Sequence, residues 1–133
     1  GIREPDIYGS KTYKDLETYI YALQDISDVK LTVKQTNYEG ILIDLIQYAN
    51  EHYDGVILNA GAFTHYSYGI RDAIKSITKP VIEVHLSDIS NREEFRKISV
   101  IQEVCVNSIS GLGFESYKEA VNALLKGREQ DDC

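Results

Sequence analysis

Gly55-Val-Ile-Leu-Asn59 and Val81-Ile-Glu-Val-His85 are two short apolar runs, and the stretch between them, Tyr68–Ile77, is predicted to be helical. A run that is apolar at nearly every position is typical of a strand that is buried on both faces. The order strand, helix, strand predicts two parallel strands joined by a right-handed crossover. The centre of the chain therefore indicates an α/β fold.

The same alternation extends toward both ends of the chain. Further strands are expected at Leu31–Thr36 and Val104–Ile109. Helices are expected from Thr12, across residues 41–49, and over Phe114–Lys126. Strands that alternate with helices predict a parallel sheet covered by helices on both faces.

Size and composition fit one globular domain, expected over residues 1–126, with a polar tail at 127–133. The chain has 133 residues, of which 43% are hydrophobic and 26% are charged. It contains neither an apolar run of membrane-spanning length nor a signal-peptide pattern, so a cytoplasmic location is expected. The net charge of −7 disfavours a nucleic-acid partner, because phosphate binding needs a basic face.

The cysteines and histidines do not indicate a metal site or a disulfide framework. Cys105 lies in an apolar run, which favours a buried thiol over a reactive one, and Cys133 ends the polar tail. The three histidines, His52, His65 and His85, do not have the spacing of metal ligands.

Polar side chains follow the predicted strands, and ligands of open parallel sheets bind beyond the carboxyl ends of the strands. Asn59 and His85 each end a strand, and Arg92 and Arg96 lie four residues apart on one helix face. Two guanidiniums there suit an anionic or polyhydroxylated ligand. Each residue also has a structural interpretation, because Asn59 can close a turn and the arginines can pair with surface acids. These residues alone predict only a polar site at this edge.

Several segments resemble those of the type II 3-dehydroquinate dehydratases, in the order and spacing of that family. The resembling segments are Gly1-Ile-Arg-Glu-Pro-Asp-Ile-Tyr-Gly9, Gln35-Thr-Asn-Tyr-Glu-Gly40 with Ile43-Asp44, Asn59-Ala-Gly-Ala-Phe-Thr-His65, Arg71-Asp72, Glu83-Val-His-Leu-Ser87, Arg92-Glu-Glu-Phe-Arg96 and Gly111-Leu-Gly113. The resemblance implies a flavodoxin-like three-layer αβα sandwich. It also implies a lyase of the shikimate pathway, which serves aromatic amino acid biosynthesis.

Such an enzyme removes water reversibly from 3-dehydroquinate by anti-elimination, giving 3-dehydroshikimate through an enolate, without a metal or cofactor. The resemblance implies that Tyr8, as a phenolate, removes the proton α to the ketone, with Arg3 holding and polarising it. His85 would act as general acid on the departing hydroxyl. The implied substrate-binding residues are Asn59, His65, Asp72 from a neighbouring subunit, Leu86, Ser87 and Arg96, with Arg92 in a supporting position near the base.

A tyrosine base needs a nearby cation. With an ordinary pKa of about 10, only about 0.1% of a tyrosine is ionised at neutral pH. A neighbouring guanidinium lowers that pKa by favouring the charged form, and Arg3 is five residues from Tyr8.

The family's first strand, with its asparagine-rich motif, has no counterpart between Gly1 and the first expected helix. In the family this strand lies between the strands equivalent to Leu31–Thr36 and Gly55–Asn59. Three explanations stay open: an incomplete amino-terminal end, a segment supplied from elsewhere, or a sheet that pairs differently. If the segment is truly absent, we expect weak or no activity.

Two other classes of function remain as alternatives. One is a catalytically silent flavodoxin-like module that binds a small acid or assembles with partners. The other is a generic nucleotide binder, which the lack of a phosphate-binding loop disfavours. The resemblance also implies a homo-oligomer, a dodecamer built from trimers, because Asp72 would serve a neighbour's site.

Overall fold

The computed structural model describes residues 12–86 and 98–131. Within them, the sheet has three parallel strands in the order β1-β2-β3. The strands are β1 (Val56–Leu58), β2 (Val81–His85) and β3 (Asn107–Ser110). The registers Val56 to Val81 and Ile82 to Asn107 align the carboxyl ends of all three strands along one edge. The parallel α/β sheet expected from the sequence is confirmed.

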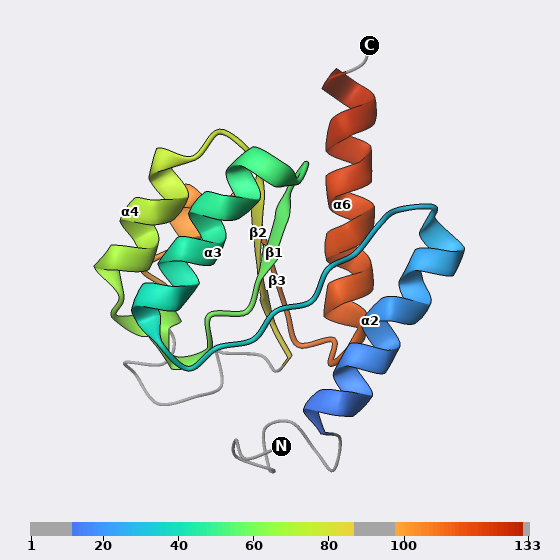
Figure 1. The fold of residues 1–133 in the computed structure, drawn as a ribbon, viewed down its shortest axis with the longest axis horizontal. Helices are drawn as coiled ribbons and strands as arrows, with labels where there is room; N and C mark the ends of the chain where they lie inside the picture. The colour runs from blue at the N-terminus through green and yellow to red at the C-terminus, as the bar shows by residue number, and fades with distance from the viewer. Residues whose placement is uncertain (1–11, 87–97, 132–133) are drawn as a thin grey trace.

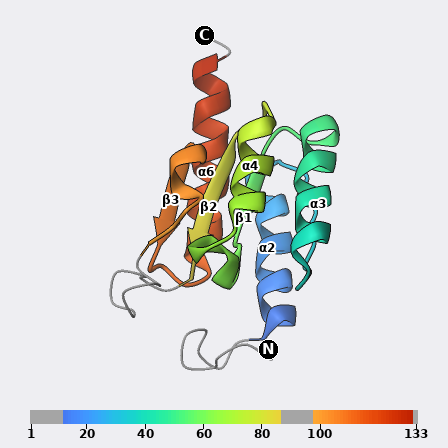
Figure 2. The same cartoon turned by 90° about the vertical axis from the view of Figure 1, so that its left-hand side faces the viewer.

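Helices cover both faces of this sheet, which gives three layers (Figure 1). One face carries α3 (Glu39–His52) and α4 (Tyr68–Ser76), and the opposite face carries α2 (Tyr13–Ser27) and α6 (Glu115–Asp131). Figure 2 shows the strands side by side between these layers. A short 3-10 helix, η1 (Gly61–His65), follows β1, and another, η3 (Gln102–Val104), precedes β3. No helix among the described residues is both long and apolar enough to cross a membrane.

The core consists of two apolar clusters, one on each face of the sheet. The first gathers Ile46, Ile70, Ile74 and Ile101 around β1 and β2, and the second joins Ile20 to Ala120 across β2. Side chains of β2 alternate between the two clusters, as those of a strand between two helical layers must. All five residues of β2 are buried. The strand is therefore the axis on which both halves of the core are built.

The prediction of a strand at Leu31–Thr36 is wrong. Within the described residues, this segment does not pair with any strand. The segment still shows strand-like alternation, because Leu31 and Val33 pack against the second apolar cluster whereas Thr32 and Lys34 are exposed. A strand needs a neighbour for its backbone hydrogen bonds. Periodicity in the sequence indicates which side chains are buried. It does not indicate whether a neighbouring strand is present to pair with the backbone.

Two other boundaries differ from expectation. Val104 ends η3, and β3 begins only at Asn107. Helix α6 runs from Glu115 to Asp131, past the end expected at Lys126. The apolar run around Val104 packs against the core without joining the sheet, and burial alone does not separate these two outcomes.

Replacing Ile70 by alanine should lower the free energy of unfolding by about 2–5 kcal/mol, because Ile70 is fully buried and the substitution leaves a cavity. Urea denaturation measures this change. The matched control is Ile26→Ala, at a position 76% exposed on α2, which should cost much less. Equal losses in the two variants would contradict the core described above.

Candidate active site

Asn59 and His85 lie at the carboxyl ends of two adjacent strands. His85 is the last residue of β2, and Asn59 directly follows β1. Leu58 is in register with Glu83, so the backbones of Asn59 and His85 reach the same edge of the sheet within one residue of each other. The structure brings these two predicted residues together at the edge where ligands of parallel sheets bind.

The His85 side chain is buried, and a carboxylate lies beside its ring. His85 is 5% exposed, and its Nε2 lies 3.2 Å from Oε2 of Glu83, which is itself completely buried. The two residues are two apart on one strand, so their side chains share a face of the sheet. No hydrogen bond of normal geometry is made by His85 Nε2 within the described residues, so the contact with Glu83 is electrostatic rather than an aligned hydrogen bond. Glu83 is well placed to orient the ring and to balance a positive charge on it.

Glu83 is held by two serine hydroxyls. Ser108 donates to Glu83 Oε1 at 2.7 Å, and Ser99 donates to Oε2. Burial by itself raises the pKa of the Glu83 carboxyl, but the contacts with His85, Ser99 and Ser108 outweigh it and lower the pKa below its ordinary value of 4.5. Glu83 is therefore a carboxylate at neutral pH, and its negative charge is available to His85.

A turn with two glycines closes the backbone at the end of β2. The N–H groups of Gly111 and Gly113 donate to the carbonyls of His85 and Leu86 at 3.3 and 2.8 Å. Both glycines have positive φ, 83° and 58°, a conformation that other residues rarely adopt. Ser116, near the start of α6, adds a hydroxyl donor to the His85 carbonyl at 3.3 Å. The carbonyl of His85 thus accepts hydrogen bonds from two donors, which fix the backbone position from which the His85 side chain extends.

Asn59 is positioned from the opposite face of the sheet. Its side-chain amide donates to the Tyr117 hydroxyl on α6 at 3.2 Å, and its side-chain oxygen accepts from the Gly61 N–H at 3.1 Å. The second bond is the turn-closing role that the sequence left open, and it coexists with a position at the site edge. Asn59 and His85 are not hydrogen-bonded to each other in the described structure.

His65 ends η1, the turn that follows β1. Its Nδ1 lies 2.7 Å from the carbonyl oxygen of Ile98. This contact links the segment after β1 to the chain that approaches η3, and the Val100 N–H donates to the Thr64 carbonyl at 2.8 Å beside it. His65 is therefore fixed on the α4 side of the same sheet edge.

Comparison with known proteins decides between the classes of function. The family model described as dehydroquinase class II matches residues 1–125. The chain belongs to the class II dehydroquinase family. Its flavodoxin-like α/β fold is shared with the crystal structure of a type II dehydroquinase from Butyrivibrio crossotus, with a TM-score of 0.89, 43% identity, and coverage of 92% of this chain and 86% of that one.

Curated relatives carry the name 3-dehydroquinate dehydratase. The relative from Bacillus pumilus is 53% identical over 125 residues, which are 94% of this chain and 85% of the relative. The relative from Bacillus subtilis is 51% identical over 125 residues, 94% of this chain and 84% of the relative. Membership in the dehydroquinase family is therefore supported by sequence and by fold together.

Several residues expected to act in this dehydroquinase-family chain lie outside the described residues, and their roles stay predictions. They are Arg3, Tyr8, Ser87, Arg92 and Arg96. Of the others, Leu86 is half-buried at the end of β2, next to His85. Asp72 is exposed on α4, whose residue Arg71 donates to the Val100 carbonyl at 2.7 Å. A role for Asp72 in a neighbouring subunit's site also stays a prediction.

Glu83 and Tyr117 were not predicted as site residues from the sequence, although each contacts a predicted site residue. A signal for Glu83 was present, because a charged residue in an otherwise apolar strand needs a partner, and His85 lies two residues further on the same face. Tyr117 is one of ten tyrosines, and only the packing of α6 against the sheet brings its hydroxyl to Asn59.

Cys105, expected to be buried, is half-buried against the first apolar cluster. Its burial, with a smaller contribution from the Glu83 charge, raises its pKa to about 12. The thiol therefore stays protonated at neutral pH, which makes it a poor nucleophile.

Stability should fall as the pH drops below about 4.5, because the lowered pKa of Glu83 makes its ionised form part of the native state. This stabilisation is complete above the pKa of the unfolded chain and is lost as the pH falls through the lower pKa of the folded state. Glu83→Gln should reduce the slope of stability against pH in that range by up to about 1.4 kcal/mol per pH unit. Urea denaturation between pH 3 and 7 measures it.

The control for this experiment is Glu119→Gln, which removes an exposed carboxylate on α6. A slope unchanged in Glu83→Gln, or reduced equally in Glu119→Gln, would show that Glu83 does not carry this pH dependence.

Proposed function

We propose that this chain catalyses the reversible dehydration of 3-dehydroquinate to 3-dehydroshikimate, a step of the shikimate pathway. The observation that supports it most directly is the buried pair of His85 and Glu83 at the carboxyl end of β2, in a chain whose residues 1–125 match the class II dehydroquinase model. Both relatives described above are named for this reaction.

The elimination takes place in two proton transfers. Tyr8, as a phenolate, removes the proton α to the ketone, and the electron pair of that C–H bond forms an enolate. As the enolate collapses, the bond from carbon to the hydroxyl breaks, and His85 gives its proton to the departing oxygen, which leaves as water. A conjugated enone remains. Arg3 stabilises the phenolate, and donors already in place stabilise the enolate.

Glu83 acts through His85 as a positioning residue. An imidazole that donates a proton must be held at a fixed angle to the leaving group, and the carboxylate 3.2 Å from Nε2 supports that angle and offsets the ring's charge. Asn59, His65, Leu86, Ser87 and Arg96 are proposed to hold the substrate's hydroxyl and carboxylate groups, with Arg92 near the base.

The test is the rise in ultraviolet absorbance of the enone when the protein meets 3-dehydroquinate. His85→Asn and Tyr8→Phe should each lower turnover by about 10²–10⁴-fold, the usual contribution of a general acid or base. The matched controls are His52→Asn and Tyr48→Phe, because both residues are exposed and lie in the second half of α3, which ends at the opposite edge of the sheet. Activity that survives in His85→Asn and Tyr8→Phe would contradict the assigned roles.

A homo-oligomer, built from trimers into a dodecamer, is also proposed. Large apolar and aromatic side chains are exposed on and beside α3 and α4, the layer that carries Asp72, and aromatic residues are enriched in the buried centres of interfaces. The exposed side chains are Tyr38 (69%), Ile41 (48%), Tyr48 (56%), Tyr66 (57%) and Tyr68 (65%).

Light scattering should give a mass that is a multiple of three 15.1-kDa chains. If Asp72 serves a neighbour's site, mixed oligomers of Asp72→Asn and His85→Asn chains should be more active than either variant alone, because some sites then combine two intact residues from different chains. A monomer, or a mixture no more active than its components, would contradict the proposal.

A further inference from the structure

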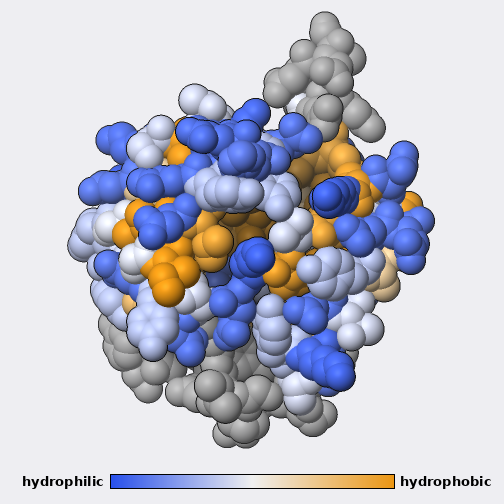
Figure 3. All heavy atoms as spheres, viewed as in Figure 1, coloured by the Kyte–Doolittle hydropathy of each residue, from blue (hydrophilic) through white to orange (hydrophobic). Residues whose placement is uncertain are grey.

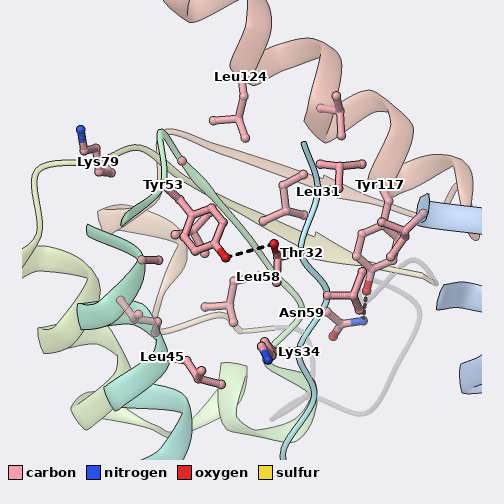
Figure 4. Close-up of a pocket in the computed structure, with 18 of the residues that line it drawn as sticks. Leu31, Thr32, Lys34, Leu45, Tyr53, Leu58, Asn59, Lys79, Tyr117 and Leu124 are labelled. Atoms are coloured by element: carbon pink, nitrogen blue, oxygen red, sulfur yellow. Dashed lines mark hydrogen bonds between the residues drawn. The ribbon is translucent and has the colours of Figure 1, made fainter. Parts of the chain in front are cut away.

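The two proposed site residues at the strand ends are held from different layers of the molecule. Asn59 lines a groove between β1 and residues 31–36, where apolar side chains gather (Figure 3), and its side chain meets Tyr117 of α6 there (Figure 4). Glu83 and His85 do not line this groove. Their side chains lie on the face of the sheet that α3 and α4 cover, one residue out of step with those that meet α6. The His85 ring is therefore positioned from the α4 side.

Ser99 bonds the Glu83 oxygen that faces His85. Its hydroxyl contacts Glu83 Oε2, the same atom that lies 3.2 Å from His85 Nε2. The Gln102 N–H donates to the Ser99 hydroxyl oxygen at 3.2 Å. Since the Glu83 carboxylate can only accept, the Ser99 hydroxyl gives its proton to it and receives the Gln102 N–H on a lone pair. Ser108 holds the other carboxylate oxygen at 2.7 Å, so a rotation that turns Oε2 away from the ring breaks both serine bonds.

The segment of residues 98–100 is anchored to the elements that follow β1. The Ile98 carbonyl oxygen lies 2.7 Å from His65 Nδ1. The Val100 N–H donates to a carbonyl of η1 at 2.8 Å, and the Arg71 guanidinium of α4 donates to the Val100 carbonyl at 2.7 Å. Three consecutive residues thus combine backbone contacts to η1 and α4 with a side-chain contact to the buried carboxylate.

These contacts connect a proposed substrate-binding residue to the proposed proton donor. From His65, the connection runs through the Ile98 carbonyl to Ser99, the next residue along the chain. From Ser99, it runs through the Glu83 carboxylate to the His85 ring. Glu83 is completely buried, so the contacts that it makes are little weakened by water.

We infer that Ser99 is a positioning residue for the proton transfer, and that the segment of residues 98–100 couples the position of His65 to that of the His85 ring. The Ser99 hydroxyl sets the direction of the Glu83 carboxylate, which in turn sets the angle of the imidazole. Ser99 acts through Glu83 and not on the substrate. This inference rests on the proposed function, because the step that it concerns is the proton transfer from His85.

Steady-state kinetics test the role of Ser99. Ser99→Ala should lower kcat by roughly two- to tenfold, the value of one hydrogen bond, and should leave KM nearly unchanged, because the groups that bind substrate stay in place. Ser99→Thr keeps the hydroxyl and should restore most of the loss. The matched control is Ser76→Ala, which removes a hydroxyl bonded to the Ala73 carbonyl at the end of α4 and should change neither constant. An unchanged kcat in Ser99→Ala, an equal loss in Ser76→Ala, or a change in KM alone would overturn the inference.

The route through Glu83 is tested in a second background. If Ser99 acts through the Glu83 carboxylate, the loss of kcat caused by Ser99→Ala should shrink to less than about twofold in a chain that already carries Glu83→Gln. A merely structural role of Ser99 gives the same loss in both backgrounds, and that result would overturn the inference.

The ring signals of the histidines give a measurement that does not depend on activity. The chain has three histidines, so the nuclear magnetic resonance signals of isotope-labelled histidine can be assigned with His52→Asn, His65→Asn and His85→Asn. Ser99→Ala should shift the His85 ring signals and leave those of His52 in place, and Ser99→Thr should restore them. Unchanged His85 signals in Ser99→Ala would overturn the inference. Full turnover in His85→Asn would instead overturn the proposed function, whatever the ring signals show.

The same spectra test the coupling through residues 98–100. His65→Asn and Arg71→Met each remove a contact that anchors the segment, and both should shift the His85 ring signals. The matched controls are His52→Asn and Glu103→Gln. The second removes only the salt bridge between Arg71 and a side chain that is 79% exposed. Neither control should shift the His85 signals. His85 signals that stay in place in His65→Asn and Arg71→Met, or that shift equally in the controls, would overturn the coupling.

Discussion

The site depends on one constraint, that the Glu83 carboxylate is completely buried in the middle of the sheet. A buried charge is costly unless it is hydrogen-bonded or paired, so Ser99, Ser108 and His85 must all stay where they are. Ser99 precedes η3, Ser108 belongs to β3, and His85 ends β2. The carboxylate thus ties together three separate segments, and it places the proposed proton donor at the edge where a substrate arrives.

Among the described residues, β1 is paired with β2 on one edge and has no strand on the other. Toward β2 and β3, the strands are paired and the Gly111–Gly113 turn secures the last carbonyls. Toward residues 31–36, the backbone edges face a groove. Asn59 lines this groove and directly follows β1.

A residue's environment could be predicted from the sequence where it depends on near neighbours in the chain. The run Val81–His85 was correctly predicted to be a strand, because it is short, rich in β-branched residues and preceded by a turn at Pro80. The strand predicted at Leu31–Thr36 is absent from the described sheet because a strand also needs a partner, which can come from anywhere in the chain. Glu83 was missed for a similar reason, since the two serines that satisfy it are 16 and 25 residues away.

By itself, the sequence determined the parallel α/β class, the edge at which polar side chains gather, and, through its motifs, the resemblance to the dehydroquinases. These features follow from local periodicity and from residue types at strand ends, which are properties of short segments. Only the tertiary structure decided that Glu83 supports His85, that Tyr117 holds Asn59, and that a groove separates β1 from residues 31–36. Such contacts join residues far apart in the chain, and their energy exists only after the layers have packed.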